Sequence, residues 1–191
     1  ALHHANTGNL CARGFGDVDT LTVREYRERT PLGRIAYRLY RHPVVLLGIG
    51  PAYLFLLRHR LPVGLMKEGW SYWISAMGTN LVTALFLALP LYLFGFGVTA
   101  LVFFPVLLSA ASLGVWLFYV QHQFPDAHWD SAADWSFHDA ALHGSSHLDL
   151  PPILGWFTGY IGIHHVHHLA SRIPFYLSLI HISEPTRLLS I

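Results

Sequence analysis

The sequence has few charged residues and a single cysteine, and each shortage excludes a class of protein. Cys11 has no second cysteine in the chain, so no disulfide can form within it. Charged residues make up 12% of the 191 residues, and hydrophobic residues make up 53%. Soluble domains usually contain about 25% charged residues, so this composition excludes both an ordinary soluble domain and intrinsic disorder. The formal net charge of +1 gives no reason to expect nucleic-acid binding.

The middle of the chain has no charged residue at all. No Asp, Glu, Lys or Arg lies between Glu68 and Asp126. Two apolar segments within this stretch, residues 73–94 and 98–120, are each long enough to cross a bilayer, which takes about 20 apolar residues. Gly95-Phe96-Gly97 separates them. We therefore predict an all-α integral membrane protein that contains a two-helix transmembrane hairpin.

The basic residues predict the orientation of this hairpin. Every Lys and Arg lies before Trp70 or after Ile163, so the positive-inside rule places both flanks of the hairpin in the cytoplasm. The N-terminal flank and the residues after Gln121 then share one membrane face. A further apolar segment, residues 42–57, is shorter and interrupted by glycine and proline, and we predict a helix that lies in the membrane interface or dips into it.

Histidine is the residue type in excess, with fourteen in the chain. His164, His167 and His168 form the pattern H-x-x-H-H, and positions i, i+3 and i+4 share one face of a helix. Neutral imidazole is a good ligand for iron, zinc or copper, so the pattern predicts a metal site. The alternatives are an accidental histidine tract or an additional zinc-binding group.

Three more histidines are candidate ligands of this metal site, and two aspartates are candidate hydrogen-bond acceptors for the ligands. His3 and His4 match the end of a second H-x-x-H-H pattern, and the predicted topology places them on the same membrane face as the first. His122 follows the second predicted span; a single histidine there is more often a cap or an interfacial residue, but its position favours a ligand. Asp126 and Asp130 are candidates to accept hydrogen bonds from ligating imidazoles, whereas a solvated acidic surface explains most of the neighbouring acidic residues.

Five short motifs run through the chain: His3–Leu10, Arg13–Val23, Tyr119–Phe124, Ala140–Ser146 and Ile161–Pro174. Together they resemble the membrane fatty acid desaturases, and most closely the bacterial acyl-lipid desaturases of the omega-6 (delta-12) type. The resemblance covers about residues 1–176, and the last motif is the most specific.

The resemblance implies half of a four-helix desaturase fold, with interfacial helices and a histidine-rich cap facing the cytoplasm, in the bacterial inner membrane. It implies an O2-dependent enzyme that introduces a cis double bond into a fatty acyl chain. The substrate would be a fatty acyl lipid or an acyl thioester, and the electron donor a protein such as ferredoxin or cytochrome b5. It also implies a non-haem centre of two iron ions held by histidines: His3, His4, His122, His164, His167 and His168.

The chain departs from the family pattern at both ends. The first histidine box of the family and the hairpin around it do not precede Ala1, and the first histidine of the second box is missing. We therefore expect this chain on its own to be inactive. Residues 177–191 do not continue the family and resemble translated sequencing-adapter sequence, so we expect a non-native tail after a partial desaturase domain, residues 1–176.

Two alternative functions stay open. One is a membrane hydroxylase or ketolase of the same histidine-box superfamily, although Ser171–Pro174 favours the acyl desaturases. The other is a non-catalytic membrane protein that binds haem or zinc. Haem would need two opposed histidines rather than a triplet on one helix face. An H-x-x-x-H motif upstream of Ala1 would favour an enzyme.

Overall fold

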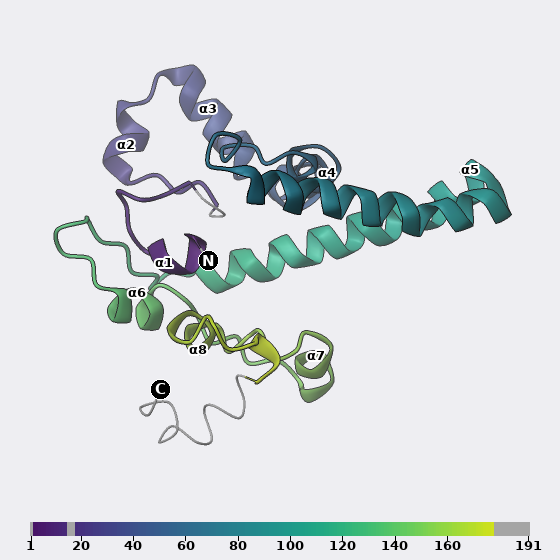
Figure 1. Cartoon of the computed structure of the whole chain (residues 1–191). Coiled ribbons are helices and arrows are strands. Elements are labelled where there is room, and N and C mark those ends of the chain that lie inside the picture. Colours follow the sequence, from purple (N-terminus) through teal and green to yellow (C-terminus); the bar gives the residue numbers. More distant parts are fainter. Residues whose placement is uncertain (1, 15–17, 178–191) are drawn as a thin grey trace. The chain divides into compact units, whose positions relative to one another are not determined.

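The computed structural model describes residues 2–14 and 18–177, and the secondary structure of these residues is helical (Figure 1). Among them only two isolated β-bridges occur, Asn9 with Asp130 and His147 with Ile163. The all-α prediction is therefore confirmed for the described residues. The predicted non-native tail falls almost entirely outside them. The chain divides into two compact units, one of residues 1–23 with 117–191 and one of residues 24–116.

The second unit begins with a series of short helices. They are α2 (Val23–Glu28), α3 (Pro31–Tyr40), the π-helix η1 (Val45–Ile49), α4 (Gly50–Leu56) and the 3-10 helix η2 (Arg58–Arg60). Thr30 caps α3 by accepting a hydrogen bond from Gly33 N at 3.1 Å, and Pro31 occupies the first turn, where its missing N–H is harmless. The predicted apolar helix of residues 42–57 corresponds to η1 and α4. Its placement in a membrane interface stays a prediction.

The longest element is α5 (Trp70–His122), which contains both predicted spans. Its backbone leaves the helical region at Gly95 (φ 74°, ψ 172°), where two helices meet at a kink, and Figure 1 shows the chain reversing there. Pro90 and Pro105 lie inside the helical parts. Only 6% of the most apolar part of α5 is buried, which suits a helix in contact with lipid rather than one in a soluble core. The long exposed apolar helix points to a membrane protein.

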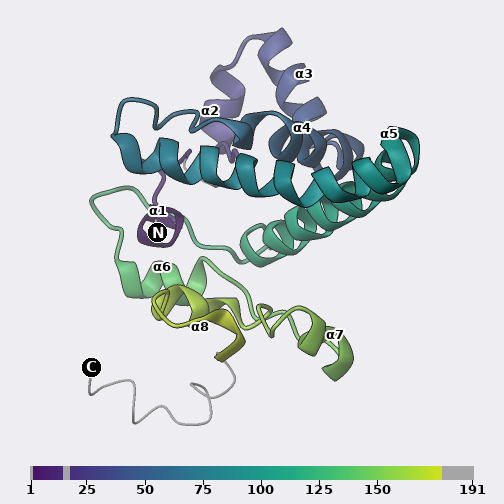
Figure 2. The same cartoon turned by 45° about the vertical axis from the view of Figure 1, so that its right-hand side comes forward.

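The first unit contains the histidine-rich segments. Its helices are α1 (Leu2–Asn6), the last turn of α5, α6 (Phe137–His143), α7 (Pro152–Phe157), α8 (His164–Leu169) and the 3-10 helix η3 (Phe175–Leu177). In Figures 1 and 2, α6 packs against both α1 and α8. The apolar core between them is small and includes Ala140, Ala141 and Ile163, which are all buried. A core of this size leaves room for polar side chains at the centre of the unit.

Candidate metal centre

The short helix α8 carries the predicted histidine triplet. Its start is fixed by backbone pairing with the segment after α6, since Leu148 N donates to Gly162 O at 2.8 Å and His164 N donates to Ser146 O at 3.3 Å. His164 and His168 are one turn apart and buried, with 5% and 0% of their surface exposed. Their Nε2 atoms lie 3.2 Å from each other. The i, i+4 spacing therefore does bring two imidazoles to one point.

His122, in the last turn of α5, lies at the centre of the cluster. Its Nε2 atom is 3.0 Å from His164 Nε2 and 3.1 Å from His3 Nε2. Its other ring nitrogen, Nδ1, lies 3.4 Å from the carbonyl oxygen of Gly144. A carbonyl can only accept a hydrogen bond, so this contact places the His122 proton on Nδ1 and leaves the Nε2 lone pair for a ligand.

Four imidazoles from three distant segments thus converge. One ring nitrogen from each of His3, His122, His164 and His168 lies within 4.8 Å of the other three. Two imidazole nitrogens that bind one metal ion at about 2.1 Å lie roughly 3.0–3.5 Å apart, and the contacts between neighbouring Nε2 atoms fall in this range. The donor set and its spacing fit a transition-metal ion.

The other two predicted ligands lie beside this group. The ring centroid of His4 is 4.6 Å from that of His167 and 4.9 Å from that of His168. His167 is in turn 5.4 Å from His164. All six histidines singled out from the sequence therefore form one continuous cluster, with His4 and His167 on its more exposed side.

The environment of the cluster keeps its imidazoles neutral. Burial, and after it the neighbouring His167, lower the pKa of His4 to about 4. Burial and then His122 lower the pKa of His164 to about 2. The pKa of His168 is lowered in the same way, first by burial and then by His164. Neutral imidazoles bind metal ions, so His4, His164 and His168 are in the ligand form at neutral pH.

The segment that follows α1 is clamped against the loop before α6. Trp135 Nε1 donates to the carbonyl oxygen of Thr7 at 2.9 Å, and Asp130 N donates to Gly8 O at 2.9 Å. Gly8 has φ +74°, and a Cβ atom there would lie 3.2 Å from His128 O. This position therefore requires glycine both for its backbone conformation and for the close approach. The clamp holds the backbone that carries His3 and His4.

Three residues around the cluster were not predicted as site residues, although Gln121 and Gly144 lie within two of the motifs that resemble the desaturases. Gln121 has 2% of its surface exposed, and its Nε2 donates to Ile161 O at 3.0 Å, which ties the end of α5 to the segment before α8. Gly144 acts through its backbone carbonyl, and Trp135 through its indole N–H. Gln121 could also have been suspected because it is a polar residue at the end of a long apolar helix, whereas Trp135 lies outside the motifs.

The two aspartates proposed as hydrogen-bond acceptors, Asp126 and Asp130, differ in their surroundings. The Asp130 carboxylate is 2.9 Å from His128 Nε2, and Asp126 is exposed. The buried Nδ1 atoms of His164 and His168 have no hydrogen-bond partner within the described part of the chain. The role of Asp126 and Asp130 as acceptors for ligating imidazoles thus stays a prediction.

Comparison with known proteins relates the whole described chain to one family. The family model for fatty acid desaturases matches residues 1–178. A protein named fatty acid desaturase from Bacillus subtilis (strain 168) is 42% identical over 178 residues, which cover 92% of this chain and 49% of that protein. The sn-1 oleoyl-lipid 12-desaturase of Synechocystis sp. is 39% identical over 57 residues, or 30% of this chain and 16% of that protein. No solved structure matches. The chain spans about half the length of the Bacillus relative.

Proposed function

The chain belongs to the fatty acid desaturase family, and on that premise we propose that its histidine cluster holds non-haem iron for O2-dependent desaturation of a fatty acyl chain. In this reaction, O2, two electrons and two protons together with two hydrogens from adjacent methylenes give a cis double bond and two molecules of water. The observation that carries the proposal is the convergence of His3, His122, His164 and His168 within 4.8 Å. Family membership alone would not place a redox centre at these residues.

We propose that six histidines are the iron ligands: His3, His4, His122, His164, His167 and His168. Two iron ions are proposed because the cluster has more imidazoles than one ion needs and extends from the buried group to His4 and His167. When bound, iron supplies the oxidising power to remove hydrogen from an unactivated methylene, which amino-acid side chains alone do not have.

In this proposal the protein's own residues position the histidine ligands and exclude water from the buried end of the cluster. The Gly144 carbonyl orients His122, and the pairing of residues 146–148 with the start of α8 fixes His164 and His168. His168 is fully buried, so water reaches this end of the cluster poorly. Asp126 and Asp130 are proposed to orient further ligands through hydrogen bonds when the centre is loaded.

The membrane arrangement and the partners follow from the same proposal. Both limbs of α5 would cross the bilayer as a hairpin, so that the residues before and after it, with the histidine cluster, face the cytoplasm of a bacterial inner membrane. The substrate would be a fatty acyl lipid, and the Synechocystis relative, by its name, acts on an oleoyl lipid. Ferredoxin or cytochrome b5 would supply the electrons.

The test is expression of the chain, with any coding sequence that precedes it in its gene, in a host whose lipids contain only monounsaturated acyl chains. Fatty-acid profiling should then detect a diunsaturated product, and the purified protein should contain about two iron ions. His167→Ala should abolish the product while the protein still inserts into the membrane. A hydroxylated product would instead identify a hydroxylase, and a protein with zinc or haem and no product would refute an iron-dependent desaturase.

A further inference from the structure

Helix α3 carries an apolar stripe with basic residues beside it. Leu32, Ile35 and Leu39 follow the spacing i, i+3, i+7 and form the stripe, and Arg34 and Arg38 lie on an adjoining face, with Arg38 three positions after Ile35. A helix of this kind, with an apolar stripe flanked by arginines, is typical of segments that lie flat in a membrane interface. The helix spans ten residues and is capped at its start, so it is a defined element.

The apolar stripe of α3 is not part of a core within the described residues. Leu32, Ile35 and Leu39 have 76%, 55% and 58% of their surface exposed. Single exposed leucines are common on protein surfaces, but three on one stripe of a ten-residue helix form a contiguous apolar patch. Such a patch needs an apolar environment that excludes water.

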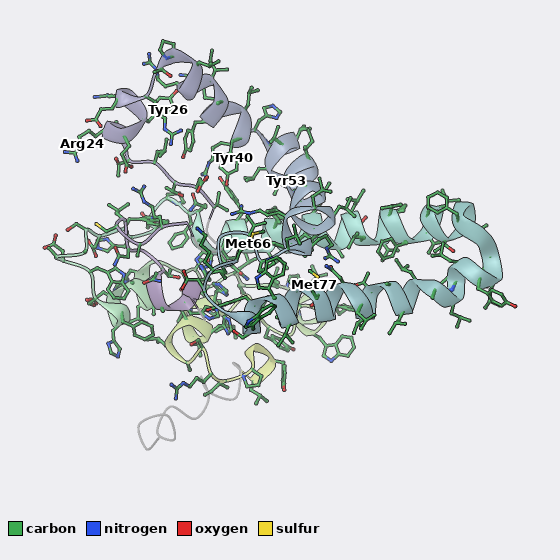
Figure 3. All side chains as sticks on the ribbon, turned by 45° about the horizontal axis from the view of Figure 1, so that its top comes forward. Arg24, Tyr26, Tyr40, Tyr53, Met66 and Met77 are labelled. Atoms are coloured by element: carbon green, nitrogen blue, oxygen red, sulfur yellow. The ribbon has the colours of Figure 1, made fainter. Side chains whose placement is uncertain are left out.

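The arginines near this stripe indicate the charge of the surface that α3 contacts. Residues 24–41 contain six arginines and two glutamates, and one of these glutamates, Glu28, already lies 3.9 Å from Arg24. Arg38 Nε donates to the hydroxyl of Tyr26, labelled in Figure 3, at 2.6 Å, which fixes α2 and its arginines beside α3. The excess of positive charge is complementary to a surface that carries phosphate groups without neutralising amines.

We propose that α3 docks on the anionic phospholipids of one membrane leaflet, with Leu32, Ile35 and Leu39 at the headgroup–acyl boundary and Arg34 and Arg38 on the lipid phosphates. The next helices support this placement, because segment 45–60, which is apolar up to Leu57, continues from α3 after a bend of 60°. The same compact unit contains most of α5, whose exposed apolar surface also suits lipid. The proposal does not depend on a bound metal.

The test measures where the apolar stripe lies in vesicles of two compositions. Cys11 is replaced first (Cys11→Ser), and Ile35→Cys is then labelled with an environment-sensitive fluorophore in the full chain, reconstituted into phosphatidylcholine vesicles with or without phosphatidylglycerol. We expect quenching by brominated acyl chains that is stronger with phosphatidylglycerol and weaker at high salt. Glu28→Cys, an exposed position on α2, serves as the control and should be quenched only by aqueous iodide.

A matched pair of variants then separates charge from structure. Arg34→Gln with Arg38→Gln should shift the docking equilibrium by about 25-fold in phosphatidylglycerol vesicles, because each arginine at an anionic surface contributes roughly five-fold. Tyr26→Phe removes the same hydrogen bond from Arg38 but keeps both charges, so docking should be unchanged. Equal quenching in both lipid compositions, or a label that neither bromolipid nor iodide reaches because protein covers it, would overturn the proposal.

Discussion

Replacement of Gly144 tests the geometry of the proposed metal centre at His122, one of its buried ligand candidates. Gly144 ends α6, where its N–H donates to Ala140 O at 2.9 Å, and its own carbonyl oxygen lies 3.4 Å from His122 Nδ1. A Cβ atom on this residue would lie 2.5 Å from Ala140 O and 3.5 Å from His128 O, and both of these are backbone atoms. No flexible side chain can move away, so Gly144→Ala must shift the backbone that positions its carbonyl.

Two consequences of this shift have separate magnitudes. Overpacking against a fixed backbone should lower the free energy of unfolding by about 1–3 kcal/mol. Loss of the acceptor that orients a ligating histidine should weaken metal binding by about 10–100-fold, or roughly 1.4–2.8 kcal/mol of binding free energy. The second effect is expected because His122 Nε2 contacts both His3 and His164, so a rotated His122 ring no longer faces the cluster.

The assay is competition between the purified chain and a chelator of known affinity for Fe2+ or Co2+, at a temperature where the variant is folded by circular dichroism. Gly78→Ala is the control, since nothing lies within 4 Å of a Cβ at this helical position and both stability and metal affinity should be kept. If Gly144→Ala is destabilised but binds the metal within about two-fold of the parent, the carbonyl of Gly144 does not orient His122 and the argument fails.

Three further outcomes are expected. His168→Ala should lose metal binding, measured by elemental analysis of the purified protein, while its helix content is unchanged, because His168 is a fully buried ligand candidate; stoichiometric metal in this variant would contradict its role. Burial lowers the pKa of His4 to about 4 and of His164 to about 2, so the unfolded chain binds protons that the folded chain does not. The free energy of unfolding should hence be level above about pH 6.5 and fall below it by up to about 1.4 kcal/mol per pH unit for each histidine, as urea titrations without metal would measure; a level profile to about pH 5 would contradict this. Trp135→Phe should destabilise the chain by about 1 kcal/mol in the same titration, because the carbonyl of Thr7 loses its donor, and unchanged stability would show that the clamp is unimportant.

The strongest sequence signals were those that depend on local periodicity. The H-x-x-H-H spacing predicted that His164 and His168 share one helix face, and their Nε2 atoms do lie 3.2 Å apart. The long uncharged stretch predicted helices, and α5 occupies it. The predicted break between the spans, Gly95-Phe96-Gly97, is sharper in the structure, where Gly95 alone leaves the helical region. One residue suffices because a positive φ is open to glycine at no steric cost.

The contacts that hold the ligands in place could not be predicted in the same way. The sequence suggested Asp126 and Asp130 as acceptors for ligating imidazoles, which stays a prediction; the acceptor for His122 is the carbonyl of Gly144. Every residue has a backbone carbonyl, so such an acceptor leaves no mark in the sequence. The contact from Trp135 to Thr7 joins residues 128 positions apart and is equally invisible to local pattern. Only the fold decides which carbonyls face the cluster.

The short helix α1 links the proposed metal centre to the fold of its unit. Five residues are far fewer than the roughly 12 that make an isolated helix marginally stable, so α1 does not form on its own. Two hydrogen bonds hold the segment at its C-terminal end, from Trp135 to Thr7 and from Asp130 to Gly8. The contacts of His3 and His4 with the other imidazoles hold the helix itself. A metal ion bound by both His3 and His122 would close a loop between α1 and the end of α5. The free energy of metal binding would then in part be free energy of folding.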